Sequence, residues 1–206
     1  MILINQKLIT IIFLILPLSL VTGPFLSDLS IVLISIFFLI ILIYEKKLNY
    51  IYKNNFFLYF ILWCFYLFLN SLISKYAILS LESSLFYFRF GFFSLALMYI
   101  FEQDNKLENK LSLSIMITFT IIIIDALFSF FYGNNSIGFE YQNNRLSGFF
   151  GDEWILGSYL IRLMPLILLV NIANYNYKLS VVFIIFLLFL DITIALSGER
   201  TAFFLN

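Results

Sequence analysis

Histidine is absent from this sequence of 206 residues, and cysteine occurs only once, as Cys64. The lack of histidine removes the commonest general base and the commonest metal ligand. Because Cys64 stands alone within an apolar run, neither a disulfide framework nor a cysteine metal site is available. The sequence therefore offers neither histidine ligands nor a cysteine site to a metal ion.

Charge is scarce as well. Charged residues make up 12% of the chain against 63% hydrophobic residues, and the formal net charge is zero. Without a basic block, a nucleic-acid partner has no electrostatic footprint to bind. A chain this apolar cannot be a soluble domain, so we identify an integral membrane protein.

The apolar residues fall into repeated runs of roughly 16–22 residues, each about long enough as a helix to cross a ~30 Å hydrocarbon core. The period-2 pattern of a membrane barrel is missing, which leaves helices as the spanning structure. We therefore predict an all-α polytopic transmembrane bundle of about seven spans plus the start of an eighth at Thr201. The predicted spans are residues 8–22, 29–44, 56–73, 85–101, 111–132, 154–173 and 179–197.

No repeat or linker divides the chain, so residues 1–206 are predicted to form a single transmembrane domain. Pro17 and Pro165 should kink the first and sixth spans. Residues 74–84 are expected to form an interfacial segment that leads into the fourth span. Since Asn206 lies just inside a new apolar run, we expect this sequence to be the amino-terminal portion of a longer protein and inactive by itself.

Basic residues are sorted by type across the predicted topology. The lysines of one side mark it as cytoplasmic, together with the N-terminus, by the positive-inside rule; they are Lys7, Lys46, Lys47, Lys53, Lys106, Lys110 and Lys178. The opposite side holds Lys75 and every arginine of the chain, namely Arg89, Arg145, Arg162 and Arg200. The guanidinium of arginine is a planar donor that can bind phosphate or carboxylate through two hydrogen bonds. We therefore predict that the outer face is the one that binds substrate.

Three ionisable residues lie at one predicted depth inside the spans. Asp125, Asp191 and Arg162 each sit ~9–12 Å below the outer rim at helical rise. Leaving one of them in lipid costs roughly 2.5–3.5 kcal/mol or more, so they should face one another or a wet cavity. Two interpretations stay open: a structural pair of Arg162 with an aspartate, and a role in binding substrate.

Residues 133–153 form a polar loop between the fifth and sixth spans, predicted to be on the outer side. Its asparagines receive no role. The run RLSGFFGD, which begins at Arg145, is less ordinary, because Gly148 and Gly151 permit close backbone approach. Asp152 and Glu153 stand where a helix N-terminus favours negative charge, and such a pair is more often a cap than a catalyst.

A second motif, LSGERTA at residues 196–202, ends the seventh span and opens the next. Gly198 breaks the helix and Glu199 and Arg200 follow it. The backbone amides at this helix start, with Arg200, could hold an anion.

At these residues the chain resembles the O-antigen ligase and Wzy-type O-antigen polymerase family of bacterial inner-membrane proteins. The resemblance rests on the RLSGFFGD run followed by a span with Gly157 and Pro165, and on LSGERTA, which follows the family's Ser-Gly-x-Arg signature. ESSLFYFRFGFF around Arg89 is similar to the family's upstream arginine segment. The other spans match in hydropathy alone.

The resemblance implies a glycosyltransferase of the inner membrane that works on its periplasmic face. It would move a glycan from undecaprenyl diphosphate to an acceptor glycan or to a lipid A core, with membrane lipids around it and with no metal or other cofactor. Arginines would bind the diphosphate as negative charge develops on it. Arg145 and Arg200 carry over by motif, Arg89 by the upstream segment and Arg162 by depth, while no catalytic base is assigned.

Two other classes of function are compatible with the sequence. A flippase or transporter of lipid-linked oligosaccharides also needs arginines and buried charges, but in a cavity open to both sides. A membrane scaffold without enzymatic activity would make the sorting of arginines a coincidence. Nothing in these residues separates a polymerase from a ligase.

Overall fold

The computed structural model describes residues 2–140, 145–151, 153–174 and 181–205, so Asp152 and Lys178 lie outside it. The described residues are almost all helical, with no strand among them beyond an isolated bridge between Asn134 and Glu140. The predicted all-α class is therefore confirmed. Four helices are long and apolar enough to cross a membrane, as a multi-pass protein requires; they are Pro24–Tyr44 (α2), Asn55–Ile73 (α4), Ala77–Gln103 and Leu107–Tyr132 (α7).

The predicted count of seven spans is not confirmed. The runs predicted as the first, sixth and seventh spans are helical, but within the described residues their apolar parts have 10–17 residues: Gln6–Val21, Leu156–Ile172 and Val181–Ser197. At 1.5 Å per residue, 17 residues extend only about 26 Å, against a hydrocarbon core of ~30 Å. The segment predicted to be interfacial forms α5 (Ala77–Leu85), which leads into α6 (Phe88–Gln103).

The chain forms two compact units, and each is described by itself. The first consists of Met1–Leu16 and Phe25–Asn105, and the second of Pro17–Pro24 and Lys106–Asn206. The boundary falls at Pro17 inside α1 (Ile2–Val21). The prediction of a single transmembrane domain over residues 1–206 stays a prediction.

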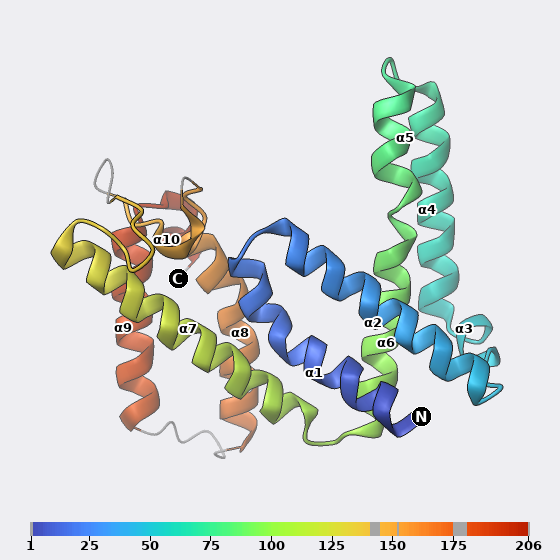
Figure 1. Ribbon diagram of the computed structural model, residues 1–206, viewed down its shortest axis with the longest axis horizontal. Coiled ribbons are helices and arrows are strands. Elements are labelled where there is room, and N and C mark those ends of the chain that lie inside the picture. The colour runs from blue at the N-terminus through green and yellow to red at the C-terminus, as the bar shows by residue number, and fades with distance from the viewer. Residues whose placement is uncertain (1, 141–144, 152, 175–180, 206) are drawn as a thin grey trace. The chain divides into compact units, whose positions relative to one another are not determined.

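In the first unit, α4 packs along α5 and α6 (Figure 1). A short helix, α3 (Asn49–Tyr52), precedes α4. The buried apolar residues of α2 recur at helical spacing and lie on one face: Ile34, Phe38, Ile41 and Leu42. Phe38 meets Tyr99 of α6 with ring centroids 5.7 Å apart, so aromatic contacts join these helices.

The end of α2 has an unusual residue. The amide of Lys47 donates to the Leu42 carbonyl at 3.0 Å and that of Lys46 to Ile43 at 3.3 Å, which is the Schellman pattern of a helix end. Lys46 occupies the left-handed position of this motif with φ 54°. Glycine normally fills this position, since a side chain there costs roughly 1–2 kcal/mol.

The second unit contains α7, α8 (Leu156–Asn174), α9 (Val181–Ser197), α10 (Arg200–Leu205) and the short 3-10 helix η1 (Gly148–Phe150). α8 contacts α7, α9 and α10. Its buried stripe is Leu156, Leu160 and Ile167. Gly157 of α8 and Ala202 of α10 lie against each other at one of these contacts, and such small residues let helix backbones approach closely.

Candidate functional site

The two arginine-bearing motifs pack against each other in the second unit. The amide of Leu146 donates to the Leu196 carbonyl at 3.4 Å. A Cβ atom at Gly198 would lie 2.9 Å from Cγ of Arg145, so the Arg145 side chain rests on this glycine. Gly198 also has φ +70°, which favours glycine independently of the space.

The Arg145 guanidinium lies over an aromatic ring. Its Cζ lies 4.9 Å from the centroid of the Trp154 ring, which fixes the side chain by a cation–π contact. Trp154 itself is 40% exposed. Among the described residues, no carboxylate forms an ion pair with Arg145.

Arg200 is the first residue of α10 and its side chain is exposed. It follows Gly198 by two residues, so it stands next to the surface on which Arg145 packs. No carboxylate in the described part of the chain pairs with Arg200 either. The site therefore presents two arginines from separate motifs.

Glu199, which directly precedes Arg200, caps helix α8. Its Oε1 accepts from the Gly157 amide at 2.8 Å and its Oε2 from the Ser158 amide at 3.1 Å, and the Ser158 hydroxyl donates to Oε2 as well. A carboxylate here satisfies two orphan amides and the positive end of the helix dipole. Glu199 therefore binds amides for which the pair Asp152 and Glu153 was the predicted cap, and in the part of the chain that the structure describes the Glu153 side chain makes no hydrogen bond to them.

Gly157 allows this arrangement. A Cβ atom at this position would lie 2.5 Å from the Ser197 hydroxyl and 3.0 Å from Cβ of Ala202. Any other side chain would push the start of α8 away from the turn that carries Glu199 and Arg200. Gly157 belongs to the motif on which the family resemblance rests, and this close packing explains why a glycine stands there.

Asp125 is buried in α7, with 4% of its surface exposed. Its Oδ1 accepts from the amide of Ser136 at 3.0 Å and from the Ser136 hydroxyl at 2.5 Å. The loop after α7 therefore folds back along the helix. Oδ2 is buried and has no partner among the described residues, and it would lie 3.6 Å from a Cβ atom at Gly148.

Asn135 is the residue of this loop that sequence reasoning missed. Its Oδ1 accepts from the amides of Ile137, Gly138 and Phe139 at 2.7–3.1 Å. Its Nδ2 donates to the Gly148 carbonyl at 2.8 Å. The available signal was its position just after the helix end at Gly133, where an asparagine commonly bonds the following amides.

Backbone conformation and packing explain why glycines stand at positions 148 and 151 of the first motif. Gly148 is buried with φ +55°, and Gly151 has φ +62° with the Phe139 ring 3.1 Å from the position of a Cβ atom. Asp152 lies outside the described residues.

The expected pair of Arg162 with Asp125 or Asp191 is absent, and that prediction is wrong. Arg162 is exposed, and neither aspartate forms an ion pair with it. The reason is its direction around the helix: Arg162 lies two residues from Leu160, about 200° around α8 from the buried stripe. Asp191 is half-buried, and its Oδ1 has no partner in the described part of the chain.

Arg89 belongs to the first unit, in α6. It pairs with Asp28 at 2.9 Å between Nη2 and Oδ2, and its Cζ lies 5.0 Å from the Phe90 centroid. Sequence reasoning did not identify Asp28. Arg89 thus has a carboxylate partner, whereas Arg145 and Arg200 have none within the ranges that the structure describes.

No group of three histidine, cysteine or carboxylate side chains comes together as metal ligands within the residues that the structure describes. Comparison with known proteins adds nothing to the geometry: no protein-family model, no curated protein and no solved structure matches this chain.

Proposed function

We propose that this protein is a membrane glycosyltransferase of the O-antigen polymerase and ligase type. In this proposal Arg145 and Arg200 bind the diphosphate of an undecaprenyl-diphosphate-linked glycan at the periplasmic face of the inner membrane. The observation that carries it is the packing of Arg145 on Gly198, which joins the two arginine motifs while neither arginine has a carboxylate partner among the described residues.

The chemistry needs such a pair. An acceptor hydroxyl attacks the anomeric carbon of the lipid-linked sugar, the bond from that carbon to the diphosphate oxygen breaks with its electron pair going to the diphosphate, and the hydroxyl proton passes to solvent water. Negative charge grows on the diphosphate as it departs. Guanidinium groups stabilise this charge by bidentate hydrogen bonds, and one that is already held in place, as Trp154 holds Arg145, does so without reorganisation. A polymerase and a ligase differ only in which acceptor supplies the hydroxyl.

Glu199 narrows the choice of anion-binding groups. Because its carboxylate occupies the amides of Gly157 and Ser158, the start of α8 has no free amide there for a substrate. The anion-binding groups of this proposal are the side chains of Arg145 and Arg200. Glu199 and Gly198 act in this proposal by positioning them.

The test replaces each arginine by lysine in the chromosomal reading frame. Lysine keeps the charge but loses the bidentate planar donor. We expect Arg145→Lys and Arg200→Lys each to remove most surface-glycan polymerisation or ligation at unchanged protein abundance. Lys110→Arg, which changes an exposed basic residue near the start of α7 in the same unit, is the control and should keep normal glycan. Wild-type glycan from both motif variants would exclude the diphosphate clamp.

An assay in detergent micelles separates an enzyme from a lipid-linked oligosaccharide flippase. Purified protein with lipid-linked glycan should release undecaprenyl diphosphate and form longer glycans, although no bilayer is there to be crossed. A flippase or a scaffold would produce neither product.

A further inference from the structure

The first unit contains a polar cleft that the proposed function does not use. It has a volume of about 400 Å³ and is formed where α2 and α6 end and where α4 begins. Its lining residues are Lys46, Lys47, Asn49, Tyr50, Lys53, Asn54 and Glu102. Three lysines thus face one carboxylate, and the cleft is positive.

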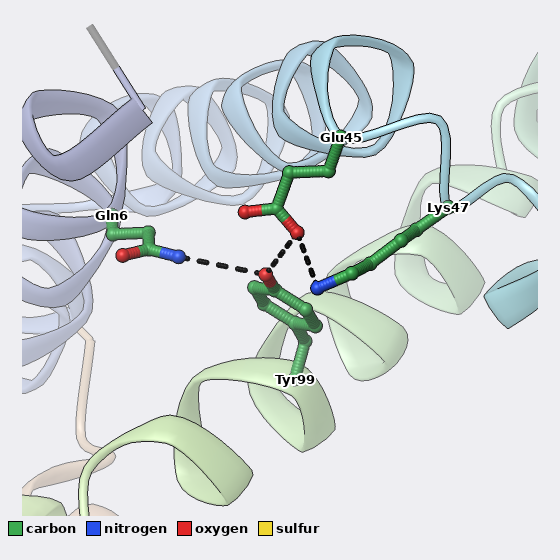
Figure 2. A network of polar contacts seen from close by, with 4 residues as sticks. All are labelled: Gln6, Glu45, Lys47 and Tyr99. Atoms are coloured by element: carbon green, nitrogen blue, oxygen red, sulfur yellow. Dashed lines mark hydrogen bonds and ion pairs between the residues drawn. The ribbon is translucent and has the colours of Figure 1, made fainter.

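One of these lysines is already neutralised. Nζ of Lys47 lies 2.8 Å from Oε2 of Glu45, and the same oxygen accepts from the Tyr99 hydroxyl at 3.0 Å, which Gln6 contacts at 3.5 Å (Figure 2). The hydrogen bond from Lys47 holds the pKa of Glu45 below its usual value. This network keeps Glu45 charged and fixes one wall of the cleft.

The positive charge that is left belongs to Lys46 and Lys53. Both are exposed, and within the described residues neither has a carboxylate partner. Glu102, the opposing charge, accepts from the Tyr50 hydroxyl at 3.1 Å. Asn54 is occupied, because its Oδ1 accepts from the amides of Phe56 and Phe57 at the start of α4.

Lys46 stands at the left-handed position of the α2 end, where glycine would be more stable. A lysine in this conformation reduces stability and needs another reason to be there. Its place at the rim of a positive cleft supplies one, since a strained residue that persists commonly serves a site.

The surroundings indicate a membrane surface. The cleft adjoins the ends of the apolar spans α2 and α4, and exposed tyrosines flank it at Tyr44 and Tyr52, with 57% and 82% of their surfaces accessible. Aromatic residues of this kind mark the headgroup layer. Basic residues next to spans attract anionic lipids.

We propose that this cleft binds the phosphate of an anionic phospholipid headgroup, with Lys46 and Lys53 as its cationic ligands. The site is separate from the arginine site and does not depend on the glycosyltransferase proposal. Free phosphate shares the chemistry, so the experiment has to distinguish the two sources.

The experiment measures lipid binding to the purified protein by native mass spectrometry, with phosphatidylglycerol and phosphatidylcholine offered at equal concentrations in mixed micelles. We expect the protein to retain phosphatidylglycerol preferentially. Lys46→Gly and Lys53→Gln should each lower that preference by about fivefold, the effect of one basic residue at an anionic surface. Glu102→Gln, which removes the opposing charge, should raise it.

Two controls make the result decisive. Lys46→Gly should raise the midpoint of thermal unfolding, because glycine suits the left-handed position, so a weaker lipid preference cannot come from misfolding. Lys75→Gln removes a lysine of the same unit outside the cleft and should leave the preference unchanged. The proposal is overturned if the cleft variants behave like wild type, if Lys75→Gln causes the same loss, or if inorganic phosphate equimolar with the lipid displaces it.

Discussion

At the scale of single residues, the cap on α8 comes from a residue distant in sequence. Glu199 bonds the amides of Gly157 and Ser158, which precede it by 42 and 41 positions. A local cap fixes only its own helix, whereas this one fixes the start of α8 to the turn that carries Arg200. The acidic residue of the second motif therefore has a structural role next to the proposed anion site.

The first prediction is that Glu199→Gln lowers the stability of the second unit by roughly 1–2 kcal/mol. The substitution removes the negative charge that favours a helix N-terminus, and it weakens the two hydrogen bonds that the amides of Gly157 and Ser158 donate to this side chain. Thermal unfolding in detergent measures the loss, and hydrogen exchange should be faster at the amides of Gly157 and Ser158. Glu153→Gln is the matched control, since this exposed carboxylate near the same helix start should have no such effect. Equal unfolding midpoints for both variants would contradict the cap.

At the scale of helices, the direction that each residue faces decides what it does. Asp125 is buried in the second unit and holds the loop through Ser136, while Arg162, predicted to lie at a similar depth, is exposed. Gly157 faces the turn before α10 so closely that a methyl group would overlap Ser197. The candidate site thus depends on the rotation of α8 about its own axis, which turns Gly157 toward the turn before α10.

The second prediction concerns this contact. Gly157→Ala should destabilise the protein by about 1–3 kcal/mol through overpacking, which exceeds the gain of up to ~1 kcal/mol that alanine brings to a helix. Adding Ser197→Ala removes the nearest atom and should recover part of the loss. Leu169→Ala, on the exposed face of the same helix, controls for the purification and assay. A gain of stability from Gly157→Ala would show that the turn and α8 are not in contact.

The sequence predicted the elements better than their contacts. Apolar runs located helices such as α4 and α7 to within a few residues, because a span must exclude charge over its whole length. Counting residues along the predicted spans put Asp125 and Arg162 at one depth in the membrane. Depth does not determine which way a side chain points around its helix, so the predicted ion pair of Arg162 with an aspartate was wrong. Asn135 was missed because its hydrogen bonds exist only once the loop has folded back on itself.

At the scale of the whole molecule, the distribution of basic residues predicts the orientation in the membrane. Four helices among the described residues are long and apolar enough to cross a membrane, and the sorting of lysines from arginines predicts which ends lie in the cytoplasm. That orientation stays a prediction, and both proposals use it: the arginine site needs the periplasmic side, and the lysine cleft is expected on the cytoplasmic side.

The third prediction tests it by cysteine labelling in a Cys64→Ser background. Ile137, 64% exposed in the loop after α7, and Tyr52, 82% exposed in α3, are suitable positions. In intact cells, a reagent that does not cross membranes should label Ile137→Cys and spare Tyr52→Cys, and permeabilised cells should label both. The reverse pattern would place the arginines in the cytoplasm and end the periplasmic glycosyltransferase proposal.

The distant cap also has a consequence for how the protein is made. A ribosome that synthesises about 5–20 residues per second needs roughly 2–8 s to add the 42 positions between Gly157 and Glu199. During that time the amides of Gly157 and Ser158 lack the carboxylate that holds them. The start of α8 is therefore capped only after α9 and the following turn have been made, so this contact forms later than the helices that it joins.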